Sequence, residues 1–316
     1  MPLPTNKHPL ITSRGPESYV FSMLTSNQSH HLPFLLSRYI SIAAYDDLEK
    51  YGVLLGFNNN YEDYYHLESG EIILDTFQIP NYVAYKGIST EVAKKLLIDN
   101  KYILGVWNEQ YIKGKACYQK KYMFGEFMLY GFDDEQSMFH SIGWIDDRFK
   151  EFKIPYHVFD EALFLDVPPQ NLFWGAHFCE NTHGFDINNV IKELQDYIAA
   201  DKNNFNSCAF GWKAIEFLAH KIMTLSEEEI HIVRRELLFL YEYARLMRMR
   251  MEHMLETSIV GDTSLLEVSH TLESSAKNLL DTSENLKYEI ISENIMRFAV
   301  DYRVLCEKIL HSLEVK

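Results

Sequence analysis

The segment Gly125–Trp144, GEFMLYGFDDEQSMFHSIGW, constrains the fold more than any other stretch of the chain. Aromatic and apolar residues lie on both sides of a short polar turn, Asp133-Asp134-Glu135. Such a pattern is typical of two β-strands joined as a hairpin with at least one buried face. The sequence therefore predicts strands at Glu126–Phe132 and Ser137–Trp144, and an antiparallel sheet that contains both.

Short strand-like runs and helical patterns alternate around this hairpin. Leu32–Ile42 is apolar and bulky, which predicts a buried helix packed beside the sheet, and Thr90–Asp99 predicts a second helix that begins at a hydroxyl residue. Further strands are predicted at Val53–Phe57, Glu71–Phe77, Tyr82–Gly87, Ile103–Trp107, Phe152–Tyr156 and Leu172–Phe178.

The pattern changes near the only Pro-Pro pair of the chain, Pro168-Pro169. Beyond it the apolar residues follow helical periodicity almost to the C-terminus. The predicted helices cover residues 186–199, 210–222, 226–257, 265–281 and 283–313. We therefore predict an α+β fold with two parts, a sheet-containing half at residues 1–166 and a mainly helical half at residues 167–316.

Charge and cysteine content limit the classes of function. The net charge of −15 argues against nucleic acid and an anionic membrane as partners, because both need a basic surface, and it suits a ligand that carries an amine. The four cysteines are widely spaced, and no run of apolar residues is long enough for a signal peptide or a transmembrane helix. These features predict a cytoplasmic protein, and no cofactor is expected.

Two segments carry a resemblance to known proteins. Tyr130-Gly131-Phe132-Asp133 resembles the end of a His-Asp-(apolar)3-Tyr-Gly-Tyr-Asp motif in papain-like proteins of the butirosin biosynthesis protein H type. The run Leu237–Leu255 resembles a helix in proteins encoded beside nonribosomal peptide synthetases, through Tyr241, Glu242, Met247 and Arg248 or Arg250. The resemblance implies a papain-like fold for residues 1–166 and a role in peptide natural-product biosynthesis. The implied partner is a nonribosomal peptide synthetase, a carrier protein or the peptide product.

The residues that catalyse reactions in that family are not matched here. Gly125 stands at the histidine position, Glu126 follows it, and no cysteine precedes Cys117. Three functions therefore stay open. The first is a binding protein that has lost its chemistry, and the second is an acyltransferase, aminoacyltransferase or thioesterase-like enzyme that acts on a carrier-protein thioester without a cysteine. The third is a self-protection protein that sequesters the product. The candidates for a site at this place are Ser26, His30, His31, Glu126 and Asp133.

Glu126 is the strongest of these candidates, because a carboxylate at the entrance of a buried strand can hold a substrate amine or act as a base. Cys117, which follows Lys113 and Lys115, is either a small buried hydrophobic residue or a thiol activated by the lysines. A metal site has one weak candidate set, in which His177, Cys179 and His183 would supply the ligands.

Overall fold

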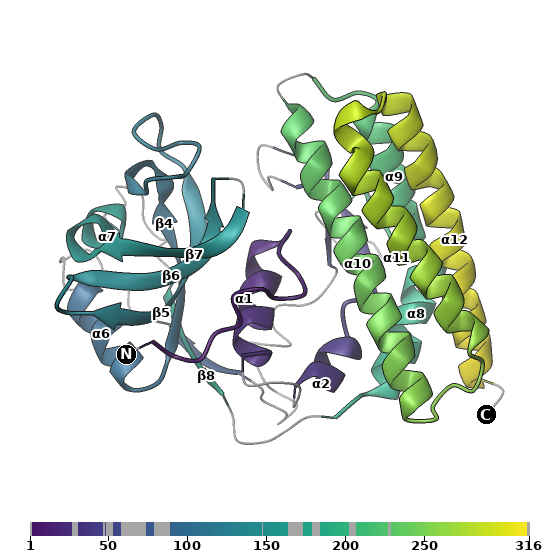
Figure 1. Cartoon of the computed structure of the whole chain (residues 1–316), viewed down its shortest axis with the longest axis horizontal. Coiled ribbons are helices and arrows are strands. Elements are labelled where there is room, and N and C mark those ends of the chain that lie inside the picture. The colour runs from purple at the N-terminus through teal and green to yellow at the C-terminus, as the bar shows by residue number, and fades with distance from the viewer. Residues whose placement is uncertain are drawn as a thin grey trace. The chain divides into compact units, whose positions relative to one another are not determined.

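The predicted hairpin forms part of a six-stranded antiparallel sheet (Figure 1). Its two strands pair directly, with Phe132 opposite Phe139, and a bulge between Leu129 and Gly131 shifts the register. The strands, in their order across the sheet, are β3 (Leu74–Gln78), β8 (Phe173–Phe178), β4 (Tyr102–Asn108), β5 (Phe124–Asp133), β6 (Met138–Ile145) and β7 (Arg148–Pro155). The two predicted hairpin strands are thereby confirmed.

The computed structural model describes residues 2–26, 31–46, 48, 53–57, 74–78, 89–146, 148–163, 173–178, 184–201, 207–226 and 229–314. These residues divide into two units. The first consists of Met1–His31 and Tyr61–His183, and the second of Leu32–Asn60 and Gly184–Lys316.

Among the described residues, three helices cover the sheet of the first unit. Helix α1 (Gly15–Leu24) contacts β5 and β6 on one face, and α6 (Ser89–Ile98) and α7 (Tyr156–Leu163) lie against the other face (Figure 1). The core below α7 is aromatic, since Phe127 stacks on Trp107 at 4.4 Å between ring centroids and also contacts Phe159. Close packing of these rings explains why the hairpin sequence is rich in large apolar residues.

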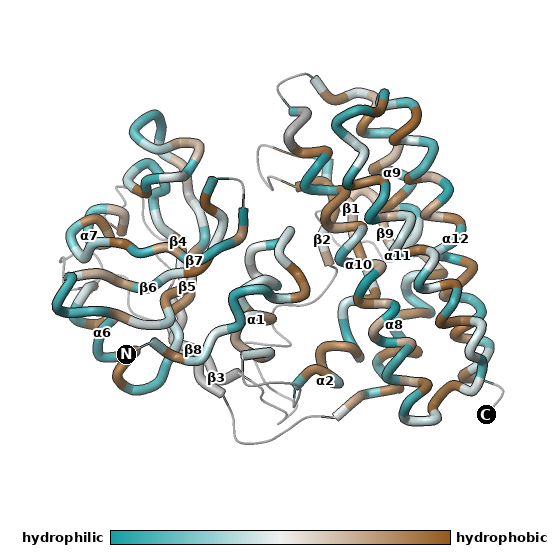
Figure 2. Tube along the Cα trace, viewed as in Figure 1, coloured by the Kyte–Doolittle hydropathy of each residue, from teal (hydrophilic) through white to brown (hydrophobic). Residues whose placement is uncertain are grey.

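The second unit is a helical bundle with a small antiparallel sheet. The sheet has the strand order β2 (Leu55–Phe57), β1 (Ile42–Ala44), β9 (Ala209–Phe210). The helices described in this unit are α2 (Leu32–Leu36), α8 (Ile187–Ala199), α9 (Trp212–Ile222), α10 (Ile230–Glu256), α11 (Ser264–Thr282) and α12 (Tyr288–Glu314). Along α11 and α12, hydrophobic and hydrophilic residues alternate in the pattern of amphipathic helices (Figure 2). Among the described helices, none combines the length and the apolar composition that crossing a bilayer requires.

The backbone between α2 and β1 is held by side chains from two helices. The guanidinium of Arg250 on α10 is fully buried and donates to the carbonyls of Leu36, at 2.5 Å, and Arg38, at 2.6 Å. Glu193 on α8 accepts from the N–H groups of Ile40, at 2.8 Å, and Ser41, at 3.1 Å. We call this set of contacts the α2–β1 clamp.

The structure confirms the mixture of helices and antiparallel sheet and corrects three details of the prediction. The predicted helix Leu32–Ile42 ends at Leu36, and Ile42 begins β1. This segment belongs to the helical unit, and within the sheet-containing unit it is α1 that packs against the six-stranded sheet. The sequence predicted one boundary between residues 166 and 167, whereas the two units interleave along the chain. The predicted strand Tyr82–Gly87 lies outside the described residues.

Candidate functional site

Gly125 is the position at which the resemblance places a catalytic histidine. It lies on β5 opposite Trp107 of β4, and the chain enters the short 3-10 helix Glu109–Tyr111 directly after β4. The carboxylate of Glu109 fills the space above Gly125, because a Cβ atom added there would lie 1.8 Å from Glu109 Oε1. No side chain can occupy position 125 unless Glu109 moves.

Glu109 belongs to a buried polar cluster with Lys115 and Cys117. The Lys115 ammonium lies 2.5 Å from Glu109 Oε1, and the two side chains are only 9% and 14% exposed. The thiol of Cys117 donates to Glu109 Oε2 at 3.7 Å. Burial raises the pKa of Cys117, and the Glu109 carboxylate raises it further, so the sulfur is a neutral thiol at pH 7. Because the thiolate is the nucleophilic form, this geometry does not activate the cysteine.

Glu126, the next residue of β5, lies on the opposite face of the sheet because successive side chains of a strand alternate. Its side chain is exposed. The carboxylate reaches the first turn of α1, where a Cβ at Gly15 would lie 2.6 Å from Glu126 Oε2. The hydroxyl of Tyr19 donates to the Glu126 carbonyl at 3.0 Å and fixes α1 to this strand. Glu126 is therefore an accessible carboxylate at the start of a helix, where negative charge is favoured.

The serine and histidine candidates stand at the end of α1 and before α2. The Ser26 hydroxyl donates to the Met23 carbonyl at 2.6 Å, so it closes the last turn of α1. His31 is half-buried directly before α2, and His30 lies outside the described residues.

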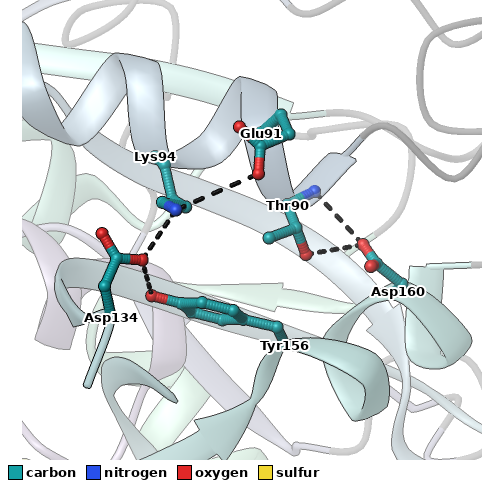
Figure 3. Close-up of polar contacts among 6 residues, drawn as sticks. All are labelled: Thr90, Glu91, Lys94, Asp134, Tyr156 and Asp160. Carbon is teal, nitrogen blue, oxygen red and sulfur yellow. Dashed lines mark hydrogen bonds and ion pairs between the residues drawn. The ribbon is translucent and has the colours of Figure 1, made fainter. Parts of the chain in front are cut away.

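Asp133 and Asp134 have structural contacts at the hairpin turn. Asp133 accepts from the Gln136 N–H at 3.1 Å, which caps the turn. Asp134 contacts the Lys94 ammonium at 2.6 Å and accepts from the Tyr156 hydroxyl at 3.0 Å (Figure 3). The hydrogen bond from Lys94 is the main reason that the pKa of Asp134 is lowered. This cluster joins the turn to α6 and α7.

Only one residue of the predicted metal set, His177, lies within the described part of the chain. The backbone of His177 lies in β8, whereas Cys179 and His183 fall outside the described residues. Among the residues that the structure describes, no group of three or more histidine, cysteine, aspartate or glutamate side chains could hold a metal ion.

Sequence reasoning missed two parts of this region. Helix α1 has a recognisable start, since Pro16 and Glu17 stand in its first turn, where proline and acidic residues are favoured. The contact between Glu109 and Gly125 has no local signal, because it joins residues of different elements. No family model matches the chain, and a search of curated proteins finds no matching relative.

Proposed function

We propose that this protein is a non-enzymatic accessory protein of nonribosomal peptide biosynthesis. Its first unit has a papain-like fold whose catalytic position has been lost, and it binds an amine-bearing peptide that is free or attached to a carrier protein. The observation that carries this proposal is the pair of neighbouring residues at the start of β5. Gly125 is filled by the Glu109 carboxylate, and Glu126 presents an exposed carboxylate.

Glu126 suits an ammonium or guanidinium ligand. A carboxylate accepts hydrogen bonds only, and its bonds to a cationic donor are stronger than those between neutral groups. The acyltransferase alternative requires a nucleophile near this position. Cys117 is buried there with a raised pKa, which disfavours a cysteine as that nucleophile. For a reaction without a cysteine the candidate is Ser26, and its hydroxyl donates to the Met23 carbonyl, so we favour binding over acyl transfer.

The proposal predicts that Glu126→Gln weakens binding of a cationic probe while the fold is retained. The probe is alanyl-pantetheine, and its N-acetylated form is the uncharged comparison. Loss of a hydrogen bond to a charged group costs about 1.5–3 kcal/mol, and the exposure of Glu126 places the expected loss at the lower end, about tenfold in Kd. Isothermal titration calorimetry measures both ligands against both proteins.

The matched control is Glu135→Gln, which removes one exposed carboxylate from the hairpin turn of the same unit. This variant should bind alanyl-pantetheine as the parent does. If Glu126→Gln and the parent bind the charged probe equally, or if the N-acetylated probe binds as tightly as the charged one, Glu126 does not recognise an amine. Turnover of the probe by the parent protein would instead support the acyltransferase alternative.

A further inference from the structure

The loop between β4 and β5 is basic in an otherwise acidic protein. Its thirteen residues 111–123, YIKGKACYQKKYM, contain four lysines and no aspartate or glutamate, while the whole chain carries a net charge of −15. The loop is drawn largely in hydrophilic colours in Figure 2. We call residues 111–123 the basic loop.

The basic loop is held in one conformation by its own backbone and by its neighbours. The Glu109 N–H donates to the Met123 carbonyl at 2.8 Å, and the Gln119 N–H donates to the Gln110 carbonyl at 2.9 Å. The Gly114 carbonyl accepts from the Asp146 N–H at 2.9 Å, which fastens the loop to the turn after β6. A loop that is already ordered loses little conformational entropy when a partner binds it.

Charged and apolar groups of the loop are both accessible. Lys113, Lys120 and Lys121 are exposed, whereas Lys115 is buried in the contact with Glu109. Tyr122 and Met123 are 40% and 42% exposed, at the point where the loop enters β5. Tyrosine and methionine are enriched in protein interfaces, and exposed lysines attract a complementary surface over a longer range.

We propose that the basic loop is the docking surface for an acidic face of a protein partner. This inference rests on the proposed function and specifies where the carrier protein binds. Met123 precedes Glu126 by three residues of extended strand, or roughly 10 Å. A carrier protein docked at Tyr122 and Met123 therefore brings an attached amine close to the Glu126 carboxylate.

The charge distribution of this protein favours a compact acidic protein as the partner of the basic loop over an extended polyanion. Exposed charges act over about 8 Å at physiological ionic strength, so a small acidic face interacts with the loop without reaching the rest of the molecule. A nucleic acid or an anionic bilayer extends much further and meets the repulsion of the acidic surface.

The test compares two triple variants with the same change in net charge. Lys113→Glu/Lys120→Glu/Lys121→Glu reverses the basic loop, and Lys277→Glu/Lys287→Glu/Lys308→Glu reverses three exposed lysines of the helical unit. The probe is a peptidyl carrier domain of a nonribosomal peptide synthetase with an unloaded phosphopantetheine arm. Calorimetry at about 50 mM and about 300 mM salt measures binding and its screening.

We expect the loop variant to lose at least tenfold in affinity at low salt, and the control variant to stay within about twofold of the parent. The corresponding Lys→Gln triple variant, which removes charge without adding any, should show a smaller loss in the same direction. Tyr122→Ala should weaken binding at both salt concentrations, because its contact is apolar.

Equal losses in the two triple variants would overturn the proposal, since they would show an effect of net charge alone. Parental affinity in the loop variant would do the same, as would an absence of carrier-domain binding by the parent. Loop-dependent binding of an anionic vesicle or an oligonucleotide, with none of the carrier domain, would assign the loop to a different partner. Alanyl-pantetheine carries no protein, so its dependence on Glu126 tests the proposed function separately from the loop.

Discussion

At the scale of single residues, the packing at the start of β5 depends on the side chain that fills the space next to Gly125. Glu109 occupies that space, and its carboxylate is fixed by Lys115 and Cys117. A buried carboxylate is stable only when it is paired and hydrogen-bonded, so these two partners hold Glu109 in place. The glycine is therefore required by packing.

This contact predicts that Gly125→Ala lowers the free energy of unfolding by about 1–3 kcal/mol, the usual cost of overpacking. Glu109→Ala also destabilises the protein, because it leaves the Lys115 ammonium buried without its carboxylate. In the double variant the methyl group of Ala at position 125 occupies the space that the Glu109 carboxylate fills in the parent protein. The combined loss should therefore be smaller than the sum of the two single losses.

Urea unfolding of the parent, the single variants and the double variant measures this coupling. Gly261→Ala is the control, since a Cβ there would meet no atom within 4 Å, and it should leave stability nearly unchanged. Strictly additive losses at positions 109 and 125 would contradict the account.

The hairpin motif predicted where the candidate site lies in the sequence, but it did not predict which side chain packs against Gly125. Tyr130-Gly131-Phe132-Asp133 is part of a confirmed hairpin, and Glu126 is an exposed strand residue. Glu109 could not be assigned from the sequence, because the residue that faces Gly125 depends on how the chain turns after β4. Local patterns predict strands well and contacts between strands and loops poorly.

At the scale of elements, the segment after α2 shows how distant side chains override a local pattern. The apolar run Leu32–Ile42 fits a single helix, yet α2 ends at Leu36 and Tyr39 adopts a φ of 61° although it is fully buried. A left-handed conformation costs about 1–2 kcal/mol in a residue with a side chain. The α2–β1 clamp offsets this cost by binding backbone groups on both sides of Tyr39.

The clamp predicts that Arg250→Met destabilises the protein far more than the same change at Arg245. Methionine preserves much of the volume but leaves the carbonyls of Leu36 and Arg38 without their donor. Leaving a buried carbonyl without its donor costs about 1–3 kcal/mol, and Arg250→Met leaves two of them. Arg245 is half-buried on the same helix, and its replacement should change stability by about 0.5 kcal/mol or less.

Thermal and urea unfolding measure these differences. Hydrogen exchange should show that the amides of Ile40 and Ser41 lose protection in Arg250→Met before those of α12 do. The reason is that the substitution destabilises the α2–β1 clamp locally. Equal stability of the two variants would show that Arg250 does not hold the segment.

At the scale of the whole molecule, composition and periodicity predicted a sheet-containing part and a helical part, and both exist. The interleaving of the units could not be predicted, because Leu32–Asn60 enters the helical unit through contacts with residues far away in the chain. Besides the clamp, Glu236 on α10 accepts from the N–H groups of Leu54 and Leu55, at 3.0 Å each. No pattern within residues 32–60 indicates these partners.

The interleaving makes a prediction about fragments. Residues 184–316 alone should not fold cooperatively, because Arg250, Glu193 and Glu236 would lose their backbone partners and α9 would lose β1. Residues 32–60 joined to residues 184–316 by a Gly/Ser linker of about 12 residues contain the complete unit. This fused chain should show a single thermal transition and a helical circular dichroism spectrum.

The fragment of residues 167–316 provides the comparison, since it begins at the boundary predicted from the Pro-Pro pair. It contains all the helices from α8 to α12 and lacks only the early segment. If interleaving determines the unit, this fragment should behave like residues 184–316 and bind a dye for exposed apolar surface, as partly folded chains do. A cooperative transition in residues 167–316 that matches the fused chain would show that the helices fold without β1 and β2. The single boundary would then describe the molecule better than two interleaved units.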